Sequence, residues 1–134
     1  MNRVSFDFDG TLDDEIVQEF ATSLGKKGFE IYIVTARLNT ENALDRGWHW
    51  IERQNEELYK VADRCGIKRE NIIFTEMVDK IEYLEGKEFI FHLDDSDDEI
   101  ELIRESEDQC EAIDVKLNTW KRICEEKLSS YLPK

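Results

Sequence analysis

The chain has 134 residues, of which 32 are acidic and 18 basic, so its net charge is −14. This length predicts one domain spanning 1–134, and a hydrophobic share of 40% can fill a core, which argues against a disordered chain. The negative charge disfavours a long nucleic acid as partner. No apolar run approaches the roughly 18 residues of a membrane helix, and no secretory pattern is visible. With three scattered cysteines, we expect a cytoplasmic protein that makes no membrane contact.

Strand-like and helix-like segments alternate along the chain. Short runs rich in β-branched and aromatic residues predict five strands, at 4–8, 29–34, 71–75, 88–93 and 112–115. Amphipathic stretches predict five helices, at 12–24, 40–65, 78–84, 97–107 and 118–132. Strict alternation is typical of an α/β protein. We therefore expect a three-layer Rossmann-like domain with a parallel five-stranded sheet.

Glycines are expected to shape two of these helices. Gly25 is the predicted stop of the first one. The 40–65 stretch is predicted as one helix, because apolar residues recur along it in steps of three and four. Gly47 lies inside that stretch and favours a kink, whereas Gly66 is suited to a left-handed cap at its end.

Polar side chains follow the carboxyl ends of the predicted strands, which meet at one edge of a parallel sheet. Several carboxylates close together need a cation to neutralise them, and ligands that are all oxygens favour Mg²⁺ over Zn²⁺. A carboxylate can also attack phosphorus and form an aspartyl phosphate. In chain order these residues are Asp7, Asp9, Thr35, Arg37, Lys80, Asp94 and Asp95.

The spacing suggests how the work would be divided. Asp7 and Asp9 are two residues apart and are expected to point the same way. One could attack while the other hands a proton to the leaving group. Gly10 permits a sharp turn and a close backbone approach. Thr35 and Lys80 could hold the oxygens of a transferring phosphoryl group.

Four strings of the sequence resemble the motifs of the haloacid dehalogenase superfamily. They occur in the order typical of that family and are V-S-F-D-F-D-G-T-L, I-Y-I-V-T, Lys80 and F-H-L-D-D. The resemblance covers residues 3–100 and implies a Mg²⁺-dependent phosphatase. A looser resemblance connects the chain with polynucleotide 3′-phosphatases and deoxynucleotidases.

The resemblance assigns a role to each matching position. Asp7 would be the nucleophile, and Asp9 the general acid and then the general base, with its backbone carbonyl on the metal. Thr35 and Lys80 would bind the phosphoryl group, with Gly10, Thr11 and Arg37 beside the substrate. The implied metal ligands are Asp7, Asp9, Asp94, Asp95 and Asp98, with Asp95 favoured over Asp94 as the direct ligand.

The segments between the motifs leave little room for the cap that many family members carry. We therefore expect no cap domain, and an open site that takes a phosphorylated small molecule or a nucleic-acid 3′ or 5′ end. A partner protein or a second copy of the chain could serve as the lid. Arg37 has two interpretations, a grip on a substrate phosphate or an ion pair with Glu41.

Two other classes remain open. A response-regulator receiver has similar residues, but its phosphorylated aspartate follows the third strand, where this chain has F-T-E. A non-catalytic metal-binding, phosphate-binding or assembly module on the same fold is the second alternative. His92, inside the fourth predicted strand, is interpreted as a packed core side chain.

Overall fold

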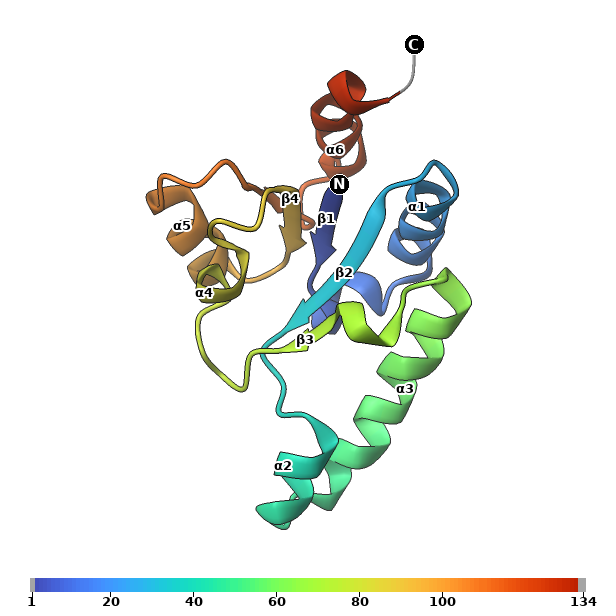
Figure 1. Cartoon of the computed structure of the whole chain (residues 1–134), viewed down its shortest axis with the longest axis vertical. Coiled ribbons are helices and arrows are strands. Elements are labelled where there is room, and N and C mark those ends of the chain that lie inside the picture. The colour runs from blue at the N-terminus through green and yellow to red at the C-terminus, as the bar shows by residue number, and fades with distance from the viewer. Residues whose placement is uncertain (1, 133–134) are drawn as a thin grey trace.

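The computed structural model describes residues 2–132 and contains a five-stranded sheet in which every strand pair is parallel (Figure 1). The strand order is β3-β2-β1-β4-β5. This confirms the α/β class and the five-stranded parallel sheet. The strands are β1 (Arg3–Phe6), β2 (Glu30–Thr35), β3 (Ile72–Phe74), β4 (Phe89–Asp94) and β5 (Glu111–Asp114).

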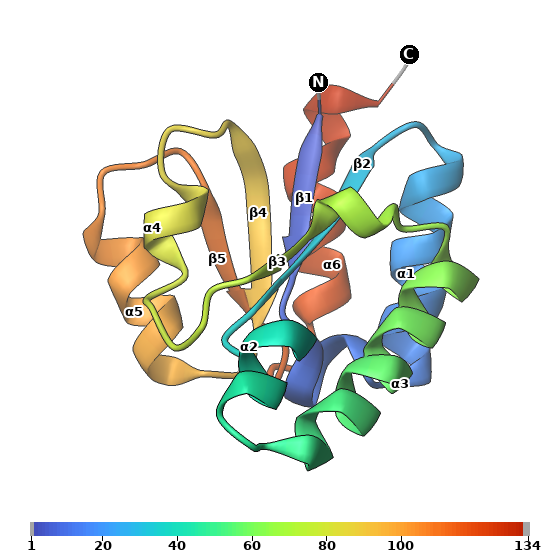
Figure 2. The same cartoon turned by 60° about the horizontal axis from the view of Figure 1, so that its bottom comes forward.

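Helices cover both faces of the sheet and give the three layers. One core lies between the sheet and α1, α3 and α6, and a smaller one between the sheet and α4 and α5 (Figure 2). Within residues 2–132, no helix is both long enough and apolar enough to span a bilayer. The helices are α1 (Glu15–Lys26), α2 (Thr40–Asp45), α3 (His49–Cys65), α4 (Ile81–Leu84), α5 (Asp97–Glu105) and α6 (Trp120–Leu128).

The two central strands, β1 and β4, sort their side chains by the period of two. Phe6 and Phe91 meet edge to face with ring centroids 5.7 Å apart, in the larger core. The alternate positions carry polar groups, and the strand register places Ser5 opposite His92. The same alternation puts Asp7 beyond Ser5 on one face. Near their carboxyl ends, β1 and β4 therefore carry apolar side chains on one face and polar side chains on the other.

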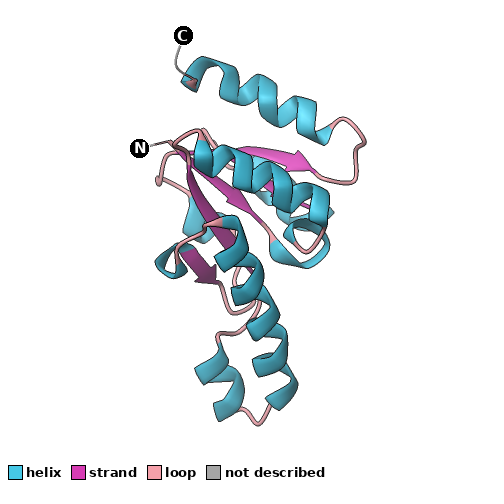
Figure 3. Cartoon of the chain, turned by 90° about the vertical axis from the view of Figure 1, so that its right-hand side faces the viewer, coloured by secondary structure: helices cyan, strands magenta, loops and turns pink. Residues whose placement is uncertain are grey.

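The single helix predicted over 40–65 is wrong. The chain forms α2, breaks at Gly47 and starts again as α3, because Gly47 has a φ of 75° in the left-handed region that ends a helix. The apolar periodicity continues across this break and hides it in the sequence. The α2–α3 pair extends beyond the sheet at the end where the strands terminate (Figure 3).

The first predicted helix also needs correction. Leu12 belongs to a tight turn over Phe8–Leu12, and α1 begins only at Glu15, where the Asp14 side chain accepts a hydrogen bond from the Ile16 amide. Gly25 does not stop this helix, which runs on to Lys26. At its Cβ position Gly25 faces only Ile31, at 3.8 Å. Gly66, in contrast, is the left-handed cap expected after α3.

Candidate active site

The candidate site lies where the strand order reverses. The chain passes from β1 outward to β2 and β3, then returns to β4 on the other side of β1. Ligands of parallel sheets bind beyond the strand ends at such a point. Asp7 directly follows β1, and Asp94 is the last residue of β4. The topology thus brings together two carboxylates that are 87 positions apart in the sequence.

Lys80 joins these two carboxylates. Its Nζ donates to Asp7 Oδ1 at 2.8 Å and to Asp94 Oδ2 at 2.7 Å. All three side chains are buried, with no more than 6% of each exposed. The ammonium comes from the start of α4, on the face of the sheet that α4 and α5 cover. One buried ammonium therefore lies between two buried carboxyl groups, at the strand ends where the sequence placed Lys80.

His92 was expected to be a core side chain, and it is fully buried, but it also belongs to this network. Its Nε2 lies 2.7 Å from Asp94 Oδ2, and its Nδ1 lies 2.8 Å from Ser5 Oγ. Burial lowers the pKa of His92, so the imidazole is neutral at neutral pH. An ionised carboxylate only accepts hydrogen bonds, so Nε2 carries the proton and the Ser5 hydroxyl donates to Nδ1.

Asp94 has its hydrogen-bonding capacity filled. Oδ1 accepts from the amides of Asp95 and Ser96, at 2.8 and 3.0 Å, while Oδ2 accepts from Lys80 and His92. A carboxylate offers about four lone-pair sites, so these four donors leave none free. Burial opposes ionisation of Asp94, but the His92 hydrogen bond and the Lys80 charge outweigh it and hold its pKa below the usual range. Asp94 therefore orients Lys80.

Asp7, Asp94 and Asp95 each place a carboxylate oxygen within 4.8 Å of the others. Because Asp94 is occupied by donors, Asp7 and Asp95 are the side chains with capacity left for a cation. Burial and the Asp94 charge raise the pKa of Asp7 to about 8, against the opposing effect of Lys80. Positive charge added beside Asp7 would reverse this shift. An all-oxygen donor set with excess negative charge fits Mg²⁺.

The turn after β1 is built around a glycine. Gly10 has a φ of 78°, and a Cβ at this position would lie only 2.1 Å from Asp95 Oδ2. Any side chain here would push the Asp95 carboxylate aside. Thr11 is fully buried, and its hydroxyl donates to Asp7 Oδ2 at 3.4 Å. Both residues therefore shape the surroundings of Asp7, and their expected contact with the substrate stays a prediction.

Asp9 does not share the direction of Asp7. Its two oxygens accept from Arg37, Oδ2 from Nε at 2.9 Å and Oδ1 from Nη2 at 2.6 Å. The turn over Phe8–Leu12 ends the extended chain between the two aspartates and removes their common direction. Neither open interpretation of Arg37 named this partner: it pairs with Asp9 rather than with Glu41. The acid–base candidate and the nucleophile candidate thus have separate cations.

Two further candidates have different outcomes. Thr35 is fully buried at the end of β2, and its hydroxyl accepts from the Arg37 amide at 3.4 Å. Asp98 is exposed on α5, outside the group of three close carboxylates. Glu99, which the sequence suggested only as an acid of the first helical turn, accepts from the Lys80 amide at 2.9 Å. It helps hold the segment that positions Lys80.

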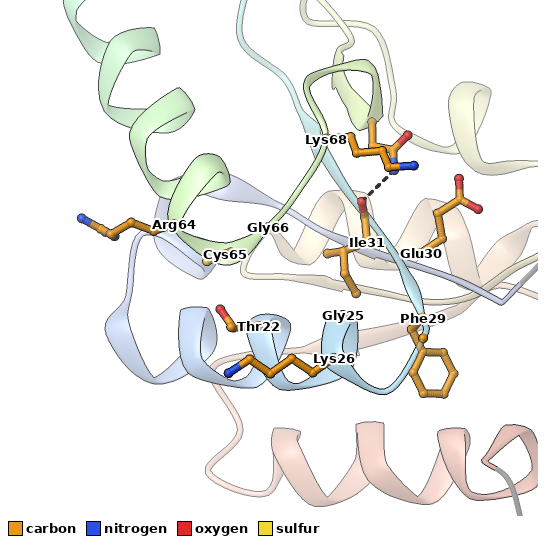
Figure 4. Close-up of a pocket in the computed structure, with 12 residues that line it drawn as sticks. Thr22, Gly25, Lys26, Phe29, Glu30, Ile31, Arg64, Cys65, Gly66 and Lys68 are labelled. Carbon is orange, nitrogen blue, oxygen red and sulfur yellow. Dashed lines mark hydrogen bonds between the residues drawn. The ribbon is translucent and has the colours of Figure 1, made fainter.

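One hollow of the molecule lies away from this cluster. It measures about 510 Å³ and opens between α1 and α3 at the opposite edge of the sheet, beside Lys26, Arg64 and Lys68 (Figure 4). A smaller hollow of about 290 Å³ borders the Gly10–Thr11 turn and Lys116. Neither hollow is lined by Asp7, Asp94 or Asp95, so chemistry rather than size identifies the candidate site.

Comparisons of the chain with protein-family models, curated proteins and solved structures found no match. The likeness of its four motifs to the haloacid dehalogenase superfamily therefore remains an interpretation of the sequence.

Proposed function

We propose that the protein is a Mg²⁺-dependent phosphomonoesterase of the haloacid dehalogenase type, acting through an aspartyl phosphate on Asp7. The observation that carries this proposal is the buried Asp7–Lys80–Asp94 cluster at the point where the strand order reverses. A structural ion pair would not need a second carboxylate with a raised pKa. Such shifts gather at functional sites.

Each residue has a defined task in the proposed reaction. An Asp7 oxygen attacks phosphorus and forms the new P–O bond, while the bond to the leaving oxygen breaks. Asp9, in its acid form, gives that oxygen its proton. As a carboxylate, Asp9 then accepts a proton from the water that attacks the aspartyl phosphate, and this releases phosphate and restores Asp7. Lys80 and Thr35 hold the phosphoryl oxygens during both transfers.

The cation would be held by the side chains of Asp7 and Asp95 and by the Asp9 backbone carbonyl. When bound, Mg²⁺ supplies positive charge to a site whose carboxylates otherwise repel the substrate phosphate. The motif predicted Asp95 as the direct ligand, and the filled hydrogen bonds of Asp94 support that choice. The same hydrogen bonds speak against a direct role for Asp94.

The proposed substrate is a nucleotide or a terminal phosphate of a nucleic acid. Arg37, on the rim two residues after Thr35, supports this choice, since a guanidinium fork suits phosphate. The net charge of −14 argues against extended contact with a long polyanion. A comparison of 3′-phosphorylated oligonucleotides of increasing length tests the nucleic-acid branch, which fails if added nucleotides bring no gain in rate.

The first test is phosphate release from p-nitrophenyl phosphate, with Mg²⁺ and with a chelator. We expect turnover that requires both Mg²⁺ and Asp7, so that Asp7→Asn is inactive. Asp63→Asn, an exposed aspartate of α3 paired with Arg69, is the matched control and should retain full activity.

Full turnover by Asp7→Asn would exclude the covalent mechanism. If the protein bound phosphate but turned over neither p-nitrophenyl phosphate nor any of a panel of nucleotides, the non-catalytic binding module would be favoured.

A further inference from the structure

Arg37 binds Asp9, the residue that the proposed reaction needs at the leaving group. Both Asp9 oxygens accept from the guanidinium, at 2.6 and 2.9 Å. In this arrangement Asp9 is turned to the rim, whereas the Asp7 side chain is turned to Lys80. For Asp9 to reach a leaving oxygen above Asp7, at least one of its contacts with Arg37 has to open.

The two halves of the pair are held very differently. Arg37 Nη1 donates to the Gln54 carbonyl at 2.8 Å and to Asn55 Oδ1 at 3.2 Å. Its guanidinium also lies over the Phe8 ring, 5.0 Å from the centroid. The Arg37 side chain is 13% exposed, but that of Asp9 is 59% exposed. The guanidinium is therefore built into the fold, and the carboxylate is the part free to move.

Asn55 explains why the guanidinium is fixed. It is fully buried in α3, and its amide nitrogen donates to the Leu38 carbonyl at 3.0 Å and to Thr40 Oγ1 at 3.3 Å. Its oxygen is left to accept from Arg37. One buried side chain thus ties α3 to the segment after β2 and aims the arginine at the rim.

We propose that Arg37 is a subsite for a second anionic group of the substrate, and that this group takes the place of Asp9 on the guanidinium and frees Asp9 for the leaving oxygen. The proposal rests on the proposed phosphatase function. It names the preferred substrate class as phosphomonoesters that carry another phosphate or a phosphodiester near the one removed. Exchange is chemically matched, because a guanidinium binds carboxylate and phosphate through the same fork.

The neighbouring cations do not offer this exchange. Lys80 is enclosed between Asp7 and Asp94. Lys116 donates to the Asp95 carbonyl and pairs with the side chains of both Asp97 and Asp114. Of these three cations, only Arg37 pairs with a single carboxylate, and that carboxylate is exposed and has no other polar partner among the described residues. In a protein of net charge −14, such a cation is the natural anchor for an anion.

Binding is measured first, on Asp7→Asn protein, so that no turnover interferes. The probes are adenosine 3′,5′-bisphosphate, each adenosine monophosphate, and a dinucleotide with a terminal phosphate. We expect the bisphosphate or the dinucleotide to bind more tightly than both monophosphates. Which of the two binds more tightly identifies whether the second group is a phosphate or a phosphodiester. Arg37→Met should remove this preference, a loss of about tenfold or more, as expected for hydrogen bonds to a charged group.

The competing role of Asp9 has its own readout. Adding Asp9→Ala to the Asp7→Asn protein should strengthen binding of the preferred probe by about two- to fivefold, the equivalent of one exposed ion pair. Monophosphate binding should change less. Unchanged or weaker binding of the preferred probe would show that Asp9 does not compete for Arg37 and would overturn the exchange.

Turnover provides the second arm. In otherwise unaltered protein, Arg37→Met should lower kcat/KM for the preferred substrate far more than for a monophosphate. Arg37→Lys keeps the charge but loses the fork, so its kcat/KM for the preferred substrate should lie between those of Arg37→Met and the unaltered protein. This variant serves as a control for a folding defect. An equal loss on all substrates would make Arg37 a general phosphoryl or structural residue. Absence of any Asp7-dependent turnover would defeat the proposed function instead, while the binding results would still decide the subsite.

Discussion

Two ion-pair systems lie side by side at the ends of the central strands, and they differ in almost every physical respect. The Asp7–Lys80–Asp94–His92 cluster is buried, and each side chain in it has at least two polar partners. The Asp9–Arg37 pair lies on the rim, and its carboxylate is 59% exposed with one partner. The first system is fixed by the fold, whereas the second can exchange partners.

The contrast shows how a small sheet protein can combine preorganisation with movement. Buried charges are costly unless each is paired and hydrogen-bonded, so the cluster has one stable arrangement. An exposed pair contributes little to stability, so its carboxylate can leave at small cost. The residues that must stay still in the proposed reaction, Asp7 and Lys80, are in the first system, and the one that must move, Asp9, is in the second.

The largest expected effect comes from removing the central cation of the cluster. Lys80→Met leaves the buried Asp94 carboxylate without its cation, so we expect the free energy of unfolding to fall by about 3–5 kcal/mol, as for a broken buried pair. Urea denaturation at neutral pH measures this change. Lys116→Met is the matched control, since Lys116 is exposed and also contacts two carboxylates. Similar losses in the two variants would contradict the contrast between buried and exposed pairs.

This cluster also shows how far the sequence could lead. The alternating pattern predicted all five strands, and the polar residues at their ends predicted Asp7, Lys80 and Asp94 at one edge. Ser5 and His92 were missed as partners, because a serine and a histidine inside apolar strands look like packed side chains. Only the register of β1 against β4 places them opposite each other, and a single sequence carries no direct signal of register.

The errors on the rim have a related cause. The 40–65 periodicity predicted one helix, but the break at Gly47 depends on its left-handed φ, which periodicity does not report. Arg37 was placed near phosphate or Glu41, since local spacing suggests only nearby partners. Its observed partners, Asp9 and Asn55, are 28 and 18 residues away. The polar strand ends were enough to predict which residues come together, but the partners of each side chain depend on long-range pairing.

A second, smaller effect should follow from cutting the outer part of the network. His92→Leu removes a donor from Asp94 and leaves the Ser5 hydroxyl without its partner, so we expect a loss of about 1–3 kcal/mol, the usual cost of unsatisfied buried groups. Ser5→Ala removes only the outer hydrogen bond and should cost about 1 kcal/mol. The same urea experiment ranks the two. If Ser5→Ala lowered the free energy of unfolding more than His92→Leu, this ranking of the two hydrogen bonds would be wrong.

The next effect has the opposite sign and depends on pH. The pKa of Asp7 is about 8 in the fold, against 3.8 ordinarily, so between these values the folded state binds more protons and stability falls as pH rises. Without metal, Asp7→Asn escapes this loss. At pH 8 the free energy of unfolding of Asp7→Asn should exceed that of the unaltered protein by at least about 1.4 kcal/mol, the equivalent of one pKa unit.

The comparison is made by thermal unfolding in chelator at pH 5 and pH 8. The advantage of Asp7→Asn should grow with pH, and a constant difference would mean that Asp7 is ionised throughout. Mg²⁺ should reduce the advantage at pH 8, because a cation bound to Asp7 stabilises only the protein that has the carboxylate.

The smallest effect on stability is expected where the proposed functional effect is large. Asp9→Ala removes an exposed carboxylate from Arg37, and the guanidinium keeps its contacts with Gln54 and Asn55. We expect the free energy of unfolding to change by less than about 1 kcal/mol, while turnover is lost. A loss as large as that of Lys80→Met would mean that Asp9 is a structural anchor of the rim. A carboxylate that anchors the fold could not also move to the leaving oxygen, so this measurement separates the two roles.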